Sequence, residues 1–406
     1  MPELKILLGG IPLGCDNIGD EAILGCVVGI LRRAAPGASV TVCTAERKET
    51  AALLGIETAP LYGFKREHSL SAFGRFVRNF DWYIWCGATG LSDYPGVAIG
   101  LLETARKQKV STIVWGVGMD SEPNPVFFRA CGRKRALFRL GELLTLGRVP
   151  MTARYEAWQW TRMRQRIVAE LNHCRFVMVR DPQTAEELRK CGFDSAVVGA
   201  DSAILQRTGR IPPVKPGHVR IGFCVSAQRS IAKRDELIAL WNLLTEQKTI
   251  ELVLIPMNPE TDFELMGSLA ARMEHPERAH LVNVVRPNDV QGVAASCDVV
   301  VSSRLHLLIL SANVGTPIVG IERGSKIRNF LAAFGLTPAG TVYECDFNAI
   351  VEGINGFLAD SGEAFRSTAE QVRGEMLARL EAAEKQLEEL LKEPNPKKKR
   401  KPESAR

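Results

Sequence analysis

The sequence lacks the cysteine and glycine motifs that mark the commonest metal, redox and nucleotide sites. None of its ten cysteines is spaced as CxxC, and no Cys/His group has zinc-finger spacing. The glycine-rich segment 9–21 contains neither GxGxxG nor a Gly-Lys-Ser/Thr ending, so it is not a dinucleotide fingerprint or a P-loop. We therefore expect no metal ion and no resident cofactor.

Long apolar runs are also absent. No uninterrupted apolar stretch approaches the ~18–20 residues of a membrane-spanning helix, and residues 1–8 lead into a strand without the apolar core of a signal peptide. Cys43, Cys86 and Cys224 lie inside apolar strands, where cysteine behaves as a small hydrophobe, a usage typical of reducing compartments. We expect a cytoplasmic protein, with peripheral contact to the inner face of the membrane left open.

The body of the chain also lacks an excess of charge. The formal net charge is +6, but residues 392–406 hold seven Lys or Arg against two Glu, which leaves 45 against 44 elsewhere. A nearly neutral body gives no reason to expect a nucleic-acid partner. The run Pro-Lys-Lys-Lys-Arg-Lys within 393–406 matches a nuclear-localisation pattern, but a disordered, solvated basic tail is the simpler interpretation.

What the sequence does contain is a repeated alternation of apolar strands and amphipathic helices, typical of an α/β protein. The Pro- and Gly-rich linker 206–218 separates a first domain, 1–205, from a second, 219–360. This organisation predicts two facing, doubly wound Rossmann-like domains. A long charged helix at 361–392 could pack across both domains or pair with another chain, so oligomerisation stays open. Strands are predicted at 4–8, 40–43, 81–86, 112–115, 176–179, 196–198, 219–225, 250–255, 281–285, 299–301, 318–321 and 342–345.

Polar and glycine residues follow several strands of the first half, at the edge where open α/β sheets bind ligands. The first turn contains Asn17, Gly19 and Asp20 ahead of a helix, and Gly118 and Arg180 each follow a later strand. Such turns present backbone N–H groups to a polar ligand. Asp20 would repel a phosphate, so we expect substrate hydroxyls there, and a simple capped turn is the alternative.

The most informative stretch is 297–329. A buried strand ends there in Ser303, Arg304 and His306 at a helix start, and Lys326 follows the next strand. Arginine, lysine and histidine at such an edge suit an anionic ligand and acid–base chemistry. A plain βαβ unit with a surface arginine and a histidine at a helix start is the alternative.

Residues 121–172 are rich in arginine and tryptophan, and an amphipathic helix is predicted at 155–171. Basic residues interleaved with aromatics could bind an anionic acceptor, nucleic acid or an anionic membrane surface. A solvated helical face, with arginine stems lying along apolar surface, explains the same pattern.

Taken in order, these motifs resemble those of the polysaccharide pyruvyl transferases. The resemblance rests on Asp16-Asn17-Ile18-Gly19-Asp20-Glu21, Trp115-Gly116-Val117-Gly118, Val179-Arg180-Asp181 with Ala200-Asp201, and Ser303-Arg304-Leu305-His306 with Gly315-Thr316-Pro317 and Lys326. The sequence departs from the family pattern at Cys15-Asp16, where Gly usually precedes Asn17. It departs again in the thinned glycine-rich turn 86–90, and at Ser202-Ala203, where a proline is frequent.

The resemblance implies a GT-B-like fold and transfer of a pyruvyl group from phosphoenolpyruvate, a co-substrate, to two hydroxyls of one sugar. The acceptor would belong to a cell-envelope glycan or its precursor, free or lipid-linked. It implies His306, Arg304 and Arg180 as catalytic residues, and Lys326, Asn17, Asp20, Gly19, Gly118 and Ser303 as substrate-binding residues. Two alternatives stay open: a nucleotide-sugar glycosyltransferase, for which Glu322 could bind the ribose, and a non-enzymatic binding protein on the same fold.

Overall fold

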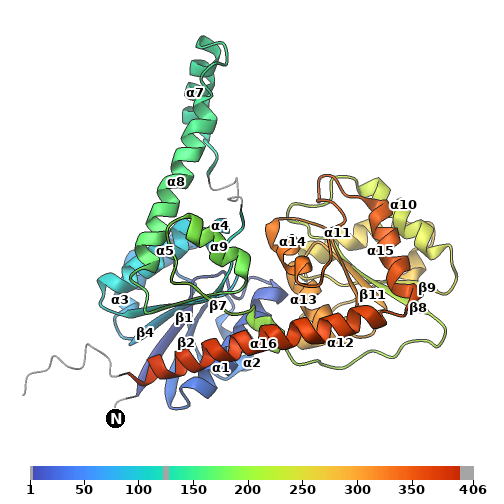
Figure 1. The fold of residues 1–406 in the computed structure, drawn as a ribbon, viewed down its shortest axis with the longest axis horizontal. Coiled ribbons are helices and arrows are strands. Elements are labelled where there is room, and N and C mark those ends of the chain that lie inside the picture. Colours follow the sequence, from blue (N-terminus) through green and yellow to red (C-terminus); the bar gives the residue numbers. More distant parts are fainter. Residues whose placement is uncertain (1–2, 122–127, 394–406) are drawn as a thin grey trace, which may run out of the picture.

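Two parallel β-sheets form the framework of the protein (Figure 1). The computed structural model describes residues 3–121 and 128–393, so the predicted basic tail from residue 394 onward lies outside the described residues. Within the described residues, no helix is both long enough and apolar enough to span a membrane. The prediction of an α/β fold with two Rossmann-like sheets and a long C-terminal helix is confirmed.

The first sheet has seven strands in the order β3-β2-β1-β4-β5-β6-β7. Most are Val-, Ile- and aromatic-rich segments buried on both faces, as a parallel sheet covered by helices requires. The strands are β1 (Leu4–Gly9), β2 (Ala38–Thr44), β3 (Glu57–Pro60), β4 (Trp82–Cys86), β5 (Ser111–Val117), β6 (Phe176–Val179) and β7 (Val197–Val198). β3 was not predicted, because a short edge strand with Glu and Pro has no apolar pattern.

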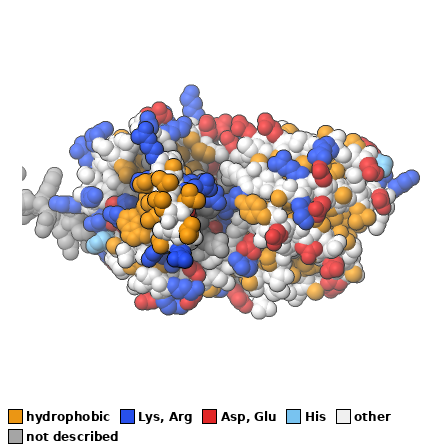
Figure 2. Space-filling model, turned by 90° about the horizontal axis from the view of Figure 1, so that it is seen from above, with side chains coloured by type: hydrophobic (Ala, Val, Ile, Leu, Met, Phe, Trp, Pro, Cys, Tyr) orange, Lys and Arg blue, Asp and Glu red, His pale blue; other side chains and the backbone are white. Residues whose placement is uncertain are grey.

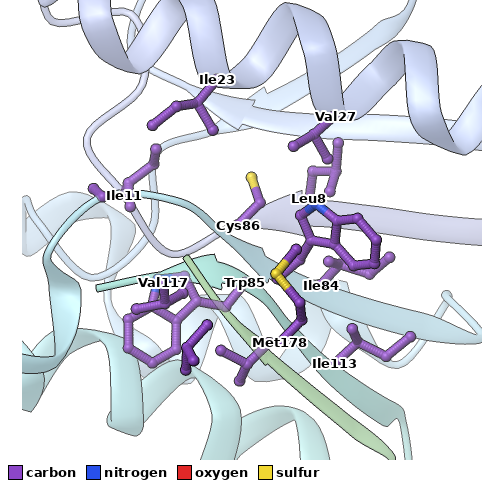
Figure 3. Close-up of a cluster of buried hydrophobic side chains, with 14 of the residues drawn as sticks. Leu8, Ile11, Ile23, Val27, Ile84, Trp85, Cys86, Ile113, Val117 and Met178 are labelled. Atoms are coloured by element: carbon purple, nitrogen blue, oxygen red, sulfur yellow. The ribbon is translucent and has the colours of Figure 1, made fainter. Parts of the chain in front are cut away.

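Helices cover both faces of this sheet and enclose the main core. Ile23 and Val27 point from α1 toward Leu8 and Cys86 in the sheet (Figure 3). The helices of the first half are α1 (Ile18–Ala34), α2 (Arg47–Leu54), α3 (Leu70–Val77), α4 (Gly90–Asp93), α5 (Pro95–Lys107), α7 (Gly132–Leu144), α8 (Met151–Leu171) and α9 (Pro182–Lys190). Residues 206–218, the predicted linker, contain no helix or strand and lead to the second sheet.

The second sheet has five strands in the order β10-β9-β8-β11-β12. The strands are β8 (Val219–Cys224), β9 (Ile250–Leu254), β10 (Ala279–Leu281), β11 (Val299–Ser302) and β12 (Ile318–Gly320). Its helices are α10 (Arg234–Thr245), α11 (Thr261–Ala270), α12 (Pro287–Ala294), α13 (Leu305–Asn313), α14 (Ser325–Ala332) and α15 (Phe347–Ala359).

Two strand predictions in the second half are wrong. β10 ends at Leu281, and the apolar run predicted as a strand over 281–285 leaves the sheet before Val285, which is 58% exposed. The segment predicted as a strand over 342–345 is a turn. There, Thr341 Oγ1 accepts hydrogen bonds from the backbone N–H groups of Tyr343 and Glu344. In both places the apolar pattern alone does not decide the structure. The first segment leaves the edge of the sheet after Leu281, and in the second the Thr341 hydroxyl binds backbone N–H groups that a strand would use for pairing.

The C-terminal helix α16 (Glu363–Lys392) joins the two halves. Figure 1 shows it running along both of them. Near its start, Phe365 stacks on Phe334 of the second half. Farther along, Glu384 forms a bidentate pair with Arg33 of α1, with both N···O distances at 2.8 Å. The helix therefore packs back on its own chain, which is one of the two arrangements that the sequence left open.

Helices α7 and α8 form an antiparallel hairpin that projects from the first half (Figure 1). The structure confirms the helix predicted at 155–171 and extends it to Met151, whereas α7 was not predicted. The lower part of α8 packs on the body through the buried Ile167 and Leu171. The upper part and all of α7 extend beyond the sheet.

Candidate active site

The carboxyl ends of the two sheets face one another across a cavity of about 330 Å³. The strand order of each sheet reverses at one point, between β1 and β4 and between β8 and β11. Ligands of open α/β sheets bind outside such points, and the loops that follow these four strands contribute to the cavity wall. The charged and titratable side chains on the wall include Asp20, Asp93, Arg180, Arg304, His306, Arg323 and Lys326.

His306 lies in the first turn of α13, directly behind β11. A Cβ atom on Gly19 would lie 2.2 Å from His306 Nδ1, so the imidazole rests against the backbone at the start of α1. The other ring nitrogen, Nε2, lies 3.5 Å from Asp201 Oδ2, and neither atom has a hydrogen-bond partner among the described residues. The ring position thus requires glycine at 19, and Asp201 is the carboxylate placed to orient the imidazole.

Asp20 and Asp201 are both buried and both interact with His306, but their pKa values move in opposite directions. Burial raises the pKa of Asp20, although His306, Asn17, Lys326 and Arg304 favour its charged form. Asn17 Nδ2 donates to Asp20 Oδ2 at 2.7 Å. Burial also acts to raise the pKa of Asp201, but the His306 imidazole 3.5 Å away, together with Arg180, holds that pKa below the ordinary value. Asp201 is therefore a carboxylate at neutral pH.

Arg180 follows β6, and its guanidinium lies on Gly118. A Cβ atom at 118 would come within 2.5 Å of Arg180 Cζ, so a side chain there would displace the guanidinium. Arg180 Nε donates to Asp181 Oδ2 at 3.0 Å, and the side chain is only 5% exposed. Asp181 also caps α9 by accepting the Thr184 N–H at 2.6 Å. Gly118 and Asp181 thus fix Arg180 at the edge of the cavity.

Arg304 and Ser303 are held by neighbours within the second half. Arg304 Nε and Nη2 donate to the two carboxylate oxygens of Asp262 at 2.9 and 2.8 Å, and both side chains are buried. Ser303 Oγ accepts the Ser226 N–H at 2.9 Å, a bond that joins the ends of β8 and β11, and Ser303 does not line the cavity. Arg304 is therefore already paired with a carboxylate, and Ser303 is not placed to contact a ligand in this cavity.

Lys326 lies at the start of α14 and reaches across to the first half. Its Nζ donates to Thr89 Oγ1 at 3.1 Å and lies 3.8 Å from Asp93 Oδ2. Asp120 of the first half accepts from the Lys326 backbone N–H at 3.0 Å, at the positive end of the helix. Burial lowers the pKa of Lys326, while Asp93 and Asp120 act to raise it. Lys326 is therefore a desolvated cation on the cavity wall.

Arg323, which was not among the predicted site residues, is a further cation on the same wall. It lies in the loop after the strand predicted at 318–321. Its Nη1 donates to Ser226 Oγ at 3.0 Å and to the Gln228 carbonyl at 3.2 Å. Burial, followed by the charge of Arg304, lowers the pKa of Arg323 to about 10. A buried cation, Arg304, beside a partly buried one, Arg323, favours an anion close to both.

A second cavity of about 280 Å³ adjoins the first. Arg180, Leu305 and Lys326 line both cavities, whereas His306 lines the first and Asp201 the second. The His306–Asp201 pair therefore stands between the two cavities. The more apolar part of the second cavity is lined by Phe330, Phe334, Val372 and Met376.

The structure brings most of the predicted site residues to one place. Six line the first cavity, namely Asn17, Asp20, Arg180, Arg304, His306 and Lys326. Gly19 lies beneath His306, and Gly118 lies beneath Arg180. Ser303 does not line the first cavity. Asp201 follows a strand as part of a motif, but nothing in the sequence pairs it with His306. Asp262 and Asp120 carry no local signal, because their partners lie far away in the sequence. No group of three or more His, Cys, Asp or Glu side chains in 3–121 and 128–393 is arranged to hold a metal ion.

Solved structures with a similar fold belong to sugar-modifying enzymes. A UDP-GlcNAc 2-epimerase from Neisseria meningitidis, bound to UDP-GlcNAc, aligns with a TM-score of 0.60 at 13% identity, covering 95% of this chain and 99% of that chain. A glycosyltransferase from Rickettsia africae aligns with a TM-score of 0.60 at 10% identity, covering 97% and 100%. At such identities the likeness shows the fold alone, which is the two-domain GT-B arrangement.

The sequence comparisons are more specific. No curated protein sequence matches the chain. The family description "Polysaccharide pyruvyl transferase" matches residues 17–325, a span that runs from Asn17 to the residue before Lys326 and includes Arg180, Asp201 and His306. The chain therefore belongs to the polysaccharide pyruvyl transferase family of transferases.

Proposed function

We propose that this protein transfers a pyruvyl group from phosphoenolpyruvate to two hydroxyls of a sugar, forming a cyclic ketal and releasing phosphate. The observation that carries the proposal is the first cavity, where four buried or partly buried cations surround His306. Phosphoenolpyruvate combines a carboxylate and a phosphate, so it needs cationic donors at two points. Family membership supports a transferase acting toward a polysaccharide.

The cations of the cavity divide into those already paired and those still available. Arg304 is bound on two nitrogens by Asp262, so it serves mainly to hold the floor of the site and to add positive potential. Arg323 forms no ion pair among the described residues, and Lys326 has only a 3.8 Å contact with Asp93. Burial lowers the pKa values of both. An anionic ligand would stabilise the charged forms that burial disfavours, so Arg323 and Lys326 are proposed donor ligands. Arg180 is the third, because its pair with Asp181 uses only Nε.

The chemistry requires two proton movements around the enol carbon. A proton must reach the methylene carbon of phosphoenolpyruvate, which makes the adjacent carbon electrophilic. One sugar hydroxyl then adds, phosphate leaves, and a second hydroxyl closes the ketal. Two hydroxyl protons are given up in total, of which one ends on the new methyl group and the other on phosphate. His306, held between Asp201 and Gly19, is the group placed to accept and return these protons.

The second cavity is the proposed acceptor site. It meets the donor cavity at Arg180, Leu305 and Lys326, and Asp201 faces into it. Aromatic and apolar side chains with a few polar groups suit the faces and edges of a sugar ring. A sugar bound there would present its hydroxyls on the Asp201 side of His306.

A nucleotide-sugar donor is less well supported. The proposed ribose ligand Glu322 pairs with Arg328 at 2.9 Å and lines neither cavity. Nucleotide sugars also need a long cleft for the base, whereas the cationic cavity suits a compact anion.

Thermal-shift titrations with phosphoenolpyruvate and with UDP- and GDP-sugars test the donor. We expect phosphoenolpyruvate to raise Tm in a saturable manner and Arg323→Met to remove the shift. Arg328→Met, an exposed neighbour outside the cavity, should keep it. Stabilisation by a nucleotide sugar alone, or an unchanged phosphoenolpyruvate shift in Arg323→Met, would refute the donor assignment.

A further inference from the structure

The α7–α8 hairpin carries apolar side chains that no described part of the chain covers. Helix α7 has no buried residue. Seven of the fourteen exposed large hydrophobic residues in the described chain lie between positions 137 and 158. They are Leu137, Leu140, Leu143, Leu144, Leu146, Met151 and Trp158, and each of the five leucines is more than half exposed. Isolated exposed apolar residues are ordinary on protein surfaces, but a cluster of this density marks an interaction site.

These leucines are not needed to hold the hairpin together. The two helices are joined by a ring contact between Phe138 and Tyr155, with centroids 5.0 Å apart, and by Glu142 Oε1, which accepts the Thr152 N–H at 2.7 Å. Leu143, Leu144 and Leu146 sit where α7 ends and the chain turns, so they form the tip. Viewed toward that end of the molecule, hydrophobic side chains gather on the projection with Lys and Arg beside them (Figure 2).

The charge of the hairpin selects the partner. Residues 128–158 contain seven Lys or Arg and two Glu. Both glutamates accept backbone N–H groups, Glu142 from Thr152 and Glu156 from Ala130. The hairpin is therefore strongly positive beside its leucines, a combination that suits an anionic lipid surface. A second copy of the same hairpin would bring like charges together.

The direction of the hairpin places its tip on the same side as the site. Helix α8 ends at Leu171 and returns the chain to the amino end of β6, so its beginning lies beyond the carboxyl edge of the first sheet. That edge carries Asp20, Arg180 and Asp201. The geometry points to a membrane-docking element: the tip leucines enter the acyl boundary of an anionic leaflet, and the neighbouring arginines and lysine bind lipid phosphates.

Docking by this tip turns the carboxyl edge of the first sheet toward the bilayer and holds it roughly 20 Å or more away, the length of the 13-residue helix α7. A transferase held there would act on a sugar carried by a lipid, and this consequence alone rests on the proposed function. The docking itself depends only on the hairpin, so vesicle binding tests it without any activity assay.

The test is co-sedimentation of the full-length protein with phosphatidylcholine vesicles that do or do not contain phosphatidylglycerol. We expect binding to the anionic vesicles and a loss of at least about tenfold in the triple variant Leu143→Gln/Leu144→Gln/Leu146→Gln. The matched control is Leu53→Gln/Leu243→Gln, two leucines on α2 and α10 with 54% and 53% exposure, which should bind as the wild type does. The basic C-terminal run is present in every variant, so only a difference between variants reports on the hairpin.

An arginine variant and a measurement of molecular size test the proposal further. Arg139→Gln/Arg148→Gln/Arg154→Gln, which removes exposed arginines near the tip in the sequence, should weaken binding and reduce its salt dependence, because fewer lipid phosphates are contacted. Sedimentation velocity without vesicles should give the same molecular size for the wild type and the leucine variant. Equal vesicle binding by the wild type and the leucine variant would overturn the proposal. A dimer that dissociates only in the leucine variant, with no vesicle binding, would also overturn it and assign the tip to self-association.

Discussion

The loops of the first sheet and those of the second meet at one cavity but carry different side chains. The first edge supplies backbone and acids: Gly19, Gly118, Asp20, Asp93, Asp120 and Asp201. The second supplies the cations Arg304, Arg323 and Lys326, and the imidazole of His306. Arg180 is a cation on the acidic edge, where its own neighbour Asp181 pairs with it.

This division makes the two halves electrostatically complementary. Asp201 faces His306, Asp93 faces Lys326, and Asp120 caps α14, so each contact crosses between the halves. By contrast, the Arg304–Asp262 pair lies wholly within the second half. We infer that His306, the proposed proton-transfer group, is positioned by the opposite half of the molecule, whereas Arg304 is held by a residue of its own half.

Gly19→Ala should have the largest effect, because it acts on the contact between the halves at His306. The new Cβ would lie 2.2 Å from Nδ1, so the ring must move by about an ångström. Such a displacement of a catalytic group costs roughly 100-fold in kcat. Phosphate release from phosphoenolpyruvate in the presence of acceptor measures the effect, and the thermal shift with the donor should persist.

Gly25→Ala is the matched control for this change. Gly25 lies in the same helix with nothing within 4 Å of its added Cβ, so the variant should keep full activity and gain stability, up to about 1 kcal/mol. If His306 carries the loss, combining Gly19→Ala with His306→Ala should lower kcat no further than His306→Ala alone. Full activity in Gly19→Ala would show that the position of the His306 ring does not matter to the reaction.

The fold could be predicted from the sequence to the extent that local patterns decide it. The apolar strands that end in glycine or polar residues, and the charged periodicity at 363–392, were sufficient to predict two parallel sheets and α16. The hydrophobic pattern at 342–345 was misleading, because the turn depends on the hydroxyl of Thr341. Helix α7 was not predicted, although Leu137, Leu140 and Leu144 recur at helical spacing. The helix buries no residue, so the pattern there does not mark a face of the core.

The placement of a residue at the candidate site was predictable wherever that residue follows a strand, as Arg180, Arg304 and His306 do. What the sequence did not reveal is which partner each one has. The 42-residue separation of Asp262 from Arg304 and the 105-residue separation of Asp201 from His306 leave no local trace. Consequently Arg304 was interpreted as a free anion ligand, although Asp262 holds two of its nitrogens.

Substitution of Lys326 tests how much the loops of the second sheet contribute to binding of phosphoenolpyruvate. Replacing it with Met should lower kcat/KM for phosphoenolpyruvate by about 10- to 100-fold, the contribution of one charge-assisted contact. Burial lowers the pKa of Lys326, so the wild-type enzyme should lose kcat/KM as pH rises, with an alkaline limb below the ordinary lysine value of ~10.4. The measurement is the pH profile of kcat/KM for phosphoenolpyruvate.

Lys326→Arg should move this alkaline limb to higher pH, because guanidinium stays protonated, and Lys48→Met on exposed α2 should change neither quantity. An unchanged limb in Lys326→Arg would assign the titration to another group.

The smallest expected effects separate the two aspartates that interact with His306. The pKa of Asp201 is depressed, so Asp201 stabilises the fold above its unfolded pKa of ~3.9, and this stability is lost as pH falls through the lower folded pKa. The pKa of Asp20 is raised, so its contribution is present below the unfolded pKa and is lost as pH rises through the folded value.

At neutral pH, Asp201→Asn should therefore lower Tm by about 1–3 °C, and Asp20→Asn should raise it by a similar amount. Both differences should vanish in acid, where the wild-type carboxyls are neutral, as Tm measured against pH would record. A lower Tm for Asp20→Asn at neutral pH would mean that attraction to His306, Lys326 and Arg304 outweighs burial, and the first edge would then hold two stabilising carboxylates rather than one.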